Sequence, residues 1–310
     1  MDNTEIGQLP YHIPALLQPT VDALNIQPSG RYADATFGGG GHSRAIMERL
    51  GPDGHLYGFD RDIDARANAP QDARFTFVHG DFRYMRNFLD YLGALPVQGI
   101  VADLGVSFHH FDEAERGFSF RADAPLDMRM NQSAPRTAAH LLADIPQKDL
   151  ERLLRVYADL RNPRRVAEAL VRARAEKPIL TTAQLAEAAE PALDPRRVKK
   201  EMAQLFQALR IEVNGEIQAL EQLLLTAADM LAPGGRLAIL TYHSVEDRLV
   251  KNFFRSGRLD GDVRTDIYGR VQSPWKPLSR QPIVASEAEV EANPRARSAK
   301  LRAAELIRNQ

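Results

Sequence analysis

The 310-residue chain contains no cysteine. This absence excludes a disulfide scaffold, a thiolate metal site and a cysteine nucleophile. The sequence also lacks any apolar run near the ~18 residues that a membrane span requires, so we expect no membrane partner. Its first residues have neither the basic start nor the apolar core of a signal peptide, and we therefore expect a cytoplasmic protein.

What the chain does have is an ordinary globular composition with an uneven distribution of charge. Apolar residues make up 44% of the chain and charged residues 26%, as in a typical soluble protein. The formal net charge of −1 does not by itself indicate a nucleic-acid binder. Basic residues nevertheless outnumber acidic ones from Lys148 to Lys200 and again after Arg255, which leaves room for a phosphate-contacting surface.

Strand and helix patterns alternate along the first hundred residues. Short strand candidates occur at 31–36, 55–59, 75–78 and 99–102, and a fifth follows at 236–242. Strands separated by helical segments indicate βαβ units and a parallel sheet.

A helical region interrupts this pattern. Between about Asp112 and Leu205 the sequence has only helical periodicity, for example at Leu150, Leu153 and Tyr157. We therefore predict a sheet domain formed by 1–112 and 205–310, with a helical domain at 113–204 inserted into it. The segment 258–277 is rich in Gly, Asp and Pro and is predicted to be a mobile loop.

Four consecutive glycines, Gly38–Gly41, lie between the first strand candidate and a helical pattern. Glycine loses more backbone freedom on folding than any other residue, so such a run needs a reason. At a strand-to-helix turn, the bare backbone admits a ligand, and the helix N-terminus offers unpaired N–H groups. Asp60, at the end of the second strand candidate, can accept hydrogen bonds from both hydroxyls of a ribose. Together these features predict a nucleoside site.

The pattern around this loop favours S-adenosylmethionine (SAM) as the nucleoside. Asp34 precedes Gly38 by four residues, which gives the D-x-x-x-G-x-G spacing of the first SAM-methyltransferase motif. A carboxylate beside the loop suits the cationic amino-acid end of SAM and would repel a pyrophosphate. Two other classes of protein stay open at this point. An NAD-dependent oxidoreductase would share the glycine loop and Asp60, and a non-catalytic RNA-binding module would explain the basic segments.

Several longer segments, in order along the chain, carry a resemblance to a known family. They are DATFGGGGHSRAI, GFDRD, HGDF, DLGVS, DEAERGFSF, PLDMRM, FQALRIEVN, LAPGGRLAILTYHSVEDRLVK and NPRARSAKLR. From about His12 to Leu306 the chain resembles the ribosomal RNA small-subunit methyltransferase H family, also called MraW. The resemblance implies SAM-dependent methylation of the N4 amine of a cytidine in the decoding region of 16S rRNA, within the small ribosomal subunit. It also implies an α/β fold, a class I SAM-methyltransferase (Rossmann-like) doubly wound sheet with an inserted helical domain.

The same resemblance implies a set of SAM-binding residues. They are Gly38, Gly40, Gly41 and His42 in the glycine loop, Asp60 at the ribose, Phe82 beside the adenine, Asp103 in DLGVS, and His110. At His110 the chain departs from the family, which usually carries glutamine there. The segments at 18–19 and 194–204 also differ from the family pattern, so no contacts are carried over to them.

Asp103 is the predicted catalytic residue and is expected to border both SAM and the target amine, and the sequence does not apportion these two roles. This residue follows the fourth strand candidate, and active sites of parallel sheets form at the carboxyl ends of strands. A hydrogen-bond acceptor there would favour a pyramidal nitrogen in cytosine, whose amine lone pair is otherwise delocalised into the ring. We predict no metal site, because the adjacent His109 and His110 point to opposite faces of an extended chain.

Six arginines in the insert and the tail are predicted to include phosphate contacts: Arg161, Arg164, Arg165, Arg172, Arg295 and Arg297. The alternative is that they only solvate helix faces or pair with Asp159, Glu168 and Glu176. In TYHSVEDR, the residues Ser244, Glu246 and Asp247 predict a helix N-terminus rather than a hydrolase site.

Overall fold

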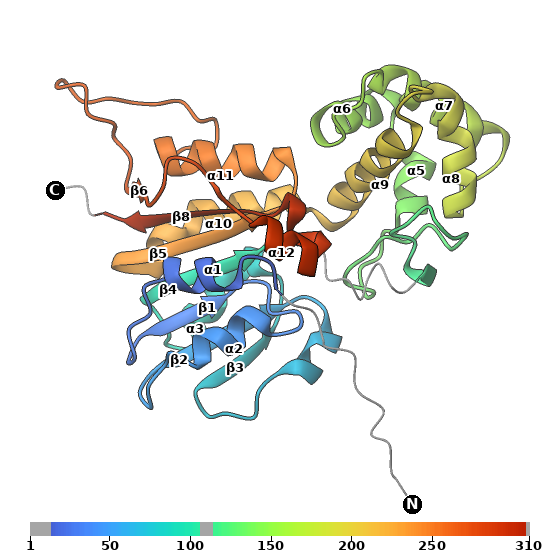
Figure 1. Cartoon of the computed structure of the whole chain (residues 1–310). Coiled ribbons are helices and arrows are strands. Elements are labelled where there is room, and N and C mark those ends of the chain that lie inside the picture. The colour runs from blue at the N-terminus through green and yellow to red at the C-terminus, as the bar shows by residue number, and fades with distance from the viewer. Residues whose placement is uncertain (1–13, 106–113, 308–310) are drawn as a thin grey trace, which may run out of the picture. The chain divides into compact units, whose positions relative to one another are not determined.

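The computed structural model describes residues 14–105 and 114–307, and the chain divides into two compact units (Figure 1). The first comprises Met1–Gly105 and Leu220–Gln310, and the second comprises Val106–Ala219. The sequence predicted an insert at 113–204. The core of the second unit also contains Leu205, Phe206, Ala208 and Leu209.

An eight-stranded sheet forms the centre of the first unit, in the order β3-β2-β1-β4-β5-β8-β6, with β7 paired to β8. The strands are β1 (Arg31–Asp34), β2 (His55–Asp60), β3 (Phe75–His79), β4 (Val97–Asp103), β5 (Leu231–Thr241), β6 (Trp275–Pro277), β7 (Ile283–Val284) and β8 (Lys300–Leu306). Strands β1 to β5 pair in parallel, and β8 runs antiparallel to β5, β6 and β7. This arrangement confirms the predicted doubly wound α/β sheet.

The parallel strands form where the sequence carries short apolar runs. Residues such as Leu56, Phe59, Ile100 and Val101 are fully buried, as expected for parallel strands that are covered on both faces. The chain runs outward from β1 to β3 and then returns to β4 on the other side of β1. Ligand sites of doubly wound sheets lie at this reversal, outside the carboxyl ends of the strands.

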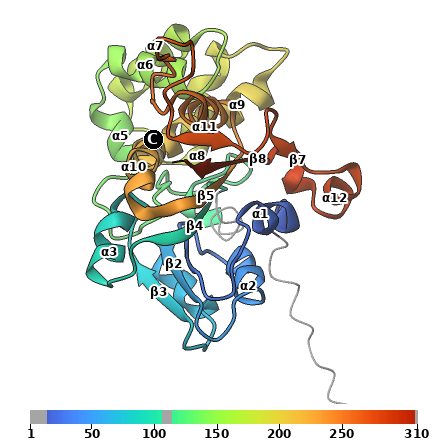
Figure 2. The same cartoon turned by 90° about the vertical axis from the view of Figure 1, so that its left-hand side faces the viewer.

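Helices cover both faces of the sheet. They are α1 (Leu17–Ala23), α2 (Gly41–Met47), α3 (Met85–Tyr91), α10 (Glu216–Met230) and α11 (Ser244–Ser256). The exposed helix α12 (Glu287–Ala292) follows β7, and short 3₁₀ turns occur at Ile63–Asn68, Phe82–Tyr84 and Pro294–Ser298. Figure 2 shows α1 and α2 on one face and α3 and α10 on the other. On the first face, Leu16, Val21 and Ile46 pack with Leu56 and Val101 of the strands into one apolar core.

The C-terminal strand β8 is absent from the sequence-based prediction. Along β8 the buried residues Leu301 and Ala303 alternate with the charged residues Lys300 and Arg302. Both charged residues pair with Asp247 of α11. Arg302 Nε lies 2.7 Å from Asp247 Oδ1. The tail motif NPRARSAKLR therefore has a structural role, because its β8 residues fasten α11 to the sheet.

The segment 258–277, predicted as a mobile loop, contains regular structure. It includes a bridge between Thr265 and Val271, and it ends in β6, which pairs with β8. Buried Trp275 anchors β6, because its ring packs against Phe253 and Phe254 of α11. The composition of the segment concealed these contacts, which depend on residues distant in sequence.

The second unit is helical, as predicted. It contains α5 (Ala138–Asp144), α6 (Gln147–Tyr157), α7 (Pro163–Glu176), α8 (Thr182–Ala189) and α9 (Val198–Asn214), with 3₁₀ turns at Ala114–Arg116 and Glu190–Ala192. Leu150, Leu154, Leu170 and Leu185 are buried in a shared core, which explains the helical periodicity. None of the helices in the described part of the chain is long and apolar enough to cross a membrane.

Candidate active site

Three aspartates lie at the carboxyl ends of adjacent parallel strands. Asp34 ends β1, Asp60 ends β2 and Asp103 ends β4, with β1 between the other two strands. Because parallel strands end at the same edge of a sheet, the three carboxylates share one edge beside the chain reversal.

The glycine loop adopts a backbone conformation that other residues resist. Gly38 and Gly40 have φ values of 50° and 71°, in the left-handed region, and Gly40 is the N-cap of α2. A Cβ at Gly40 would lie 3.0 Å from the Phe37 ring, and one at Gly41 would lie 2.2 Å from Pro14. The loop is therefore closely packed at Gly40 and Gly41, at a helix N-terminus, and side chains at these two positions would clash.

Asp60 holds this loop in place. The backbone N–H of Gly38 donates to Asp60 Oδ2 at 2.8 Å, and that of Asp62 donates to Oδ1 at 2.8 Å. Burial raises the pKa of Asp60 above its ordinary value. Each carboxylate oxygen keeps a second lone pair, so both can still accept a hydrogen bond from a ribose hydroxyl.

Asp34, at the start of the glycine loop, makes contacts within the fold. Its side chain is buried, and it accepts hydrogen bonds from Ser43 Oγ at 2.7 Å and the backbone N–H of Thr36 at 3.0 Å. Burial raises its pKa, and the Ser43 hydroxyl opposes that change. Asp34 thus ties the end of β1 to α2 across the glycine loop.

Asp103 is fixed from several directions. Its backbone N–H donates to Thr36 Oγ1 at 2.7 Å, and its Oδ1 accepts from the backbone N–H of Gly105 at 3.1 Å. Its Oδ2 lies 3.7 Å from Nδ1 of His42, whose side chain is 7% exposed. His42 Nε2 is buried without a hydrogen-bond partner in the described structure. An unpartnered buried nitrogen in this loop is available to a bound ligand.

Tyr242, directly after β5, is a site residue that the sequence-based prediction missed. Its hydroxyl donates a hydrogen bond to the Asp103 carboxylate, and its ring lies against Gly105. Burial, followed by the charge of Asp103, raises the pKa of Tyr242 far above its ordinary value. Tyr242 therefore remains a protonated donor that holds the carboxylate. The only sequence signal was its position at the end of the fifth strand candidate, 236–242.

Two predicted cofactor residues remain. Phe82 is buried in the 3₁₀ turn after β3, and the backbone N–H of Gly80 just before it donates to the carbonyl oxygen of Asp60. This link brings the ends of β2 and β3 together on the adenine side of the predicted site. His110 lies outside the described residues.

The TYHSVEDR segment forms a helix N-terminus, as predicted. The cap of α11 is His243, whose Nδ1 accepts from the backbone N–H of Glu246. Glu246 Oε2 in turn accepts from the backbone N–H groups of Tyr242 at 2.9 Å and His243 at 3.3 Å. This capping box orients the chain that carries Tyr242 towards Asp103.

Comparison with known proteins identifies the family to which this site belongs. The model of the MraW methylase family matches residues 10–307. The chain belongs to the MraW methylase family. Curated relatives named ribosomal RNA small subunit methyltransferase H are 52% identical to it in Phocaeicola vulgatus, over 95% of this chain and 97% of that protein. The same name and identity are found in Porphyromonas gingivalis, with coverage of 96% and 97%.

MraW methylases are SAM-dependent, and the sheet of this chain is that of a class I SAM methyltransferase. Membership of the MraW methylase family excludes the NAD-dependent oxidoreductase, the alternative that the glycine loop alone had left open. Among solved structures, an rRNA methylase from Streptococcus thermophilus is 13% identical with a TM-score of 0.39, over 96% of this chain and 99% of that one. A methyltransferase from Streptococcus mutans in complex with SAH is 12% identical with a TM-score of 0.40, over 96% and 100%.

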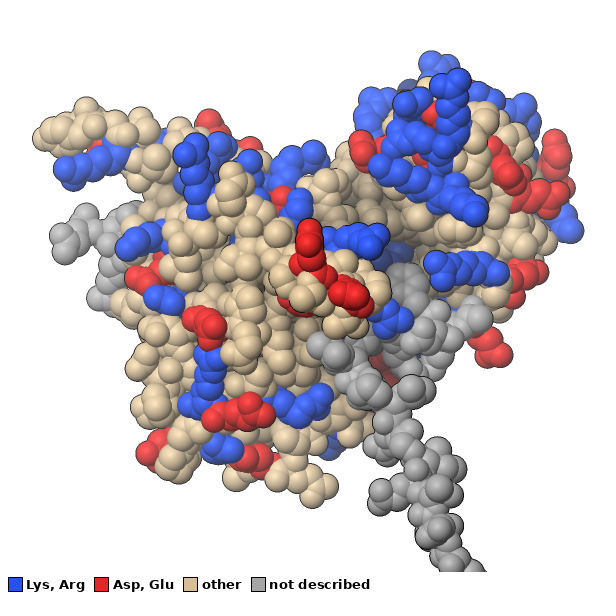
Figure 3. Space-filling model, in the orientation of Figure 1, with Lys and Arg blue, Asp and Glu red and all other residues tan. Residues whose placement is uncertain are grey.

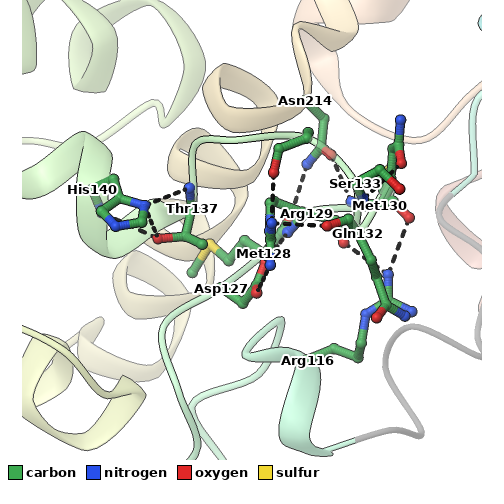
Figure 4. A network of polar contacts seen from close by, with 12 residues as sticks. Arg116, Asp127, Met128, Arg129, Met130, Gln132, Ser133, Thr137, His140 and Asn214 are labelled. Atoms are coloured by element: carbon green, nitrogen blue, oxygen red, sulfur yellow. Dashed lines mark hydrogen bonds and ion pairs between the residues drawn. The ribbon is translucent and has the colours of Figure 1, made fainter.

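The PLDMRM motif of this MraW chain builds a polar network in the helical unit (Figure 4). Arg129 forms two hydrogen bonds of 2.7 Å to the carboxylate of Asp127. Asn214 of α9 accepts from the backbone N–H of Met130 and donates to the carbonyl oxygen of Met128, both at 2.8 Å. Met128 is fully buried with φ of 62°, so these bonds stabilise a strained loop.

The six arginines predicted to include phosphate contacts differ in whether they already have a partner within the chain. Arg161 pairs with Asp194 at 2.6 Å, and Arg164 pairs with Glu168 at 2.8 Å, one turn along α7. Arg165 donates to a backbone carbonyl oxygen. Arg172 and Arg297 are exposed and have no acidic partner among the described residues. Figure 3 shows Lys and Arg side chains gathered over α6 and α7 of the helical unit.

Proposed function

We propose that this protein transfers a methyl group from SAM to the exocyclic N4 amine of a cytidine in the decoding region of 16S rRNA, within the small ribosomal subunit. The observation that carries the proposal is the Asp103 carboxylate, held by Gly105 and Tyr242 beside the glycine loop. The names of the curated relatives support the rRNA substrate. The resemblance set out from the sequence supports the choice of cytidine N4.

The residues at the strand ends fit SAM. The glycine loop leaves its backbone bare, and His42 offers an unsatisfied ring nitrogen in the same loop. Asp60 presents two carboxylate oxygens that are already aligned by backbone N–H groups, so the ribose hydroxyls meet a preorganised acceptor. Phe82 stands on the adenine side. Bound SAM supplies an electrophilic methyl group on its sulfonium.

Asp103 acts on the target amine. The cytosine amine is a poor nucleophile because its lone pair is delocalised into the ring. A carboxylate oxygen that accepts one N4 hydrogen favours a pyramidal nitrogen and takes up the surplus proton after transfer. Methyl transfer is an in-line displacement, so the fixed position of Asp103 also provides the orientation on which much of the rate depends. Tyr242 keeps the carboxylate from rotating away.

The binding part of this proposal is tested by titration. We expect the purified protein to bind SAM and to show no binding of NAD under the same conditions, measured by isothermal titration calorimetry. Binding of NAD with no binding of SAM would contradict the cofactor assignment. A protein that binds rRNA but neither cofactor would be a non-catalytic RNA-binding module.

Asp60→Ala is expected to weaken SAM binding by roughly 2–3 kcal/mol, because it removes a charged acceptor of two ribose hydrogen bonds. The substitution also releases the N–H of Gly38, so the glycine loop loses part of its support. Calorimetric titration with SAM measures the change, and affinity for rRNA should stay the same. Asp64→Ala, in the neighbouring 3₁₀ turn, is the control. A folded Asp60→Ala variant with unchanged SAM affinity would remove Asp60 from the site.

Arg172→Glu is expected to weaken binding to small-subunit particles and to lower the salt slope of log K by about one, because one phosphate contact is lost. Arg164→Glu is the matched control on the same helix, since Arg164 is already paired with Glu168. Particle binding measured from low to physiological salt distinguishes the Arg172→Glu variant from the Arg164→Glu variant. The SAM affinity of both variants should be unaffected. An Arg172→Glu variant with the wild-type slope would support the account in which these arginines only solvate α7.

A further inference from the structure

The segment between α11 and β6 forms a hairpin that Figure 1 shows extending beyond both elements. Its two arms are joined by the bridge between Thr265 and Val271. Backbone hydrogen bonds lie on either side of this bridge, from Asp266 to Arg270 at 2.9 Å and from Gln272 to Arg264 at 2.8 Å. The tip of the hairpin is therefore a defined turn.

Two residues supply the chemistry that this turn requires. Gly269 has φ of 79°, and its N–H donates to the carbonyl oxygen of Asp266 at 3.0 Å. The Asp266 side chain also accepts from the N–H groups of Tyr268 at 2.8 Å and Arg270 at 2.9 Å. An acidic first residue and a left-handed glycine are what a three-residue hairpin loop needs. The turn does not require any particular side chain at the two residues between them, Ile267 and Tyr268.

Those two residues are nevertheless large and apolar, and they are displayed to solvent. Ile267 is 92% exposed and Tyr268 is 78% exposed. Neither contributes to the turn through its side chain. A rigid turn that presents an aromatic ring and a branched aliphatic side chain has the form of a stacking or wedging element for nucleic acid.

Two cations accompany the exposed ring. The Arg270 guanidinium lies 5.9 Å from the centre of the Tyr268 ring, over one of its faces. Arg264 is on the same face of the hairpin as Arg270, because residues 264 and 266 stand opposite 272 and 270. In the described part of the chain, neither arginine forms an ion pair with a carboxylate. The tip thus presents an exposed aromatic ring with Arg270 over one face and Arg264 on the same side of the hairpin, a combination that suits base stacking and phosphate contact in RNA.

We propose that the hairpin tip at 264–270 is a second RNA-binding element of this enzyme, on which an unpaired base of the substrate rRNA stacks. The base lies on the face of Tyr268 opposite Arg270, and Arg264 and Arg270 contact its flanking phosphates. Ile267 packs against the neighbouring nucleotide. This element rests on the proposed function, since it requires that the substrate be rRNA. A protein partner is disfavoured because the apolar tip is small and is flanked by cations.

Methyl transfer to small-subunit particles tests this element. Tyr268→Ala is expected to raise KM for the particles about tenfold, near the lower end of what stacking on an aromatic ring contributes. Tyr268→Phe keeps the ring and should retain the wild-type KM. Tyr91→Ala is the matched control, because Tyr91 of α3 is 88% exposed on the same unit. SAM affinity and thermal stability should be unchanged in all three variants.

A wild-type KM for Tyr268→Ala would overturn the element while leaving the proposed function intact. Failure of the wild-type protein to methylate the particles would instead contradict the proposed function. Ultraviolet cross-linking of the wild-type complex gives a second measurement, in which the peptide with Tyr268 is expected to carry a nucleotide. A cross-link from this peptide to a ribosomal protein or to a second copy of the chain would also overturn the assignment to RNA.

Discussion

Asp103→Asn is expected to lower kcat for methyl transfer about 10²- to 10⁴-fold, the range that a positioned proton acceptor contributes. The amide has nearly the shape of the carboxylate, and its single oxygen can still accept from the backbone N–H of Gly105. It carries no negative charge, however, and cannot take up the proton from the cytosine amine. Single-turnover transfer of labelled methyl to small-subunit particles measures the loss directly.

The amide variant should bind SAM with an affinity within about tenfold of wild type, because the loss falls on the reaction rather than on the cofactor. Asp53→Asn, at an exposed turn before β2, is the control and should be fully active. Full activity of Asp103→Asn would mean that Asp103 only supports the end of β4. A variant that loses SAM binding and activity together would place Asp103 at the cofactor alone.

Gly40→Val is expected to abolish measurable SAM binding, a loss of more than about 100-fold. Residue 40 has φ of 71°, and a Cβ there would press on the Phe37 ring at 3.0 Å and on Arg44 at 3.1 Å. A β-branched side chain strongly resists this conformation, so the loop must move. Titration with SAM and a thermal melt, performed together, measure binding and fold separately.

Gly93→Val separates backbone strain from the loss of the cradle. Gly93 also has a left-handed φ, of 62°, but a Cβ there meets no atom within 4 Å, and the residue is remote from the glycine loop. Both variants should lose thermal stability through strain. Only Gly40→Val should lose SAM binding. If the two variants bind SAM equally well, the glycine loop is not the cofactor cradle.

The parts of the fold that depend on local pattern could be predicted from the sequence. The five parallel strands follow apolar runs, and the helices of the insert follow the spacing of residues such as Leu150 and Leu154. Strand β8 could not be predicted in this way. Its charged residues Lys300 and Arg302 are compatible with a strand only because Asp247 of α11 pairs with them. That partner is more than fifty residues away and has no local signal.

The candidate site likewise contains residues that a sequence pattern reveals and residues that only the folded sheet brings together. The glycine loop and Asp60 have a recognisable spacing, and the strand-end position of Asp103 follows from the predicted sheet. Thr36 and Tyr242 support Asp103 only because β1, β4 and β5 end side by side, which is a property of the folded sheet. For the same reason the sequence did not reveal that the Asp34 carboxylate accepts hydrogen bonds from Ser43 and the backbone.

The surface charges show a further limit of sequence-based prediction. A local excess of basic residues predicted phosphate contacts throughout the insert, yet Arg161 is matched with Asp194, which is 33 residues away. Of the predicted acidic partners, Glu168 does pair with Arg164. Counting charges along the chain does not reveal such pairs, because they form across the packing of helices. The exposed Arg172 remains the strongest candidate of the insert group.

Identification of the modified nucleoside tests the central claim most directly. Small ribosomal particles that lack the modification are incubated with labelled SAM and the purified protein, and the RNA is digested to nucleosides and analysed by mass spectrometry. We expect the label in N4-methylated cytidine from a single position in the decoding region of 16S rRNA, and no transfer by Asp103→Asn. Label in another base or at another atom of cytidine, or no label with a protein that binds SAM, would contradict the proposed function.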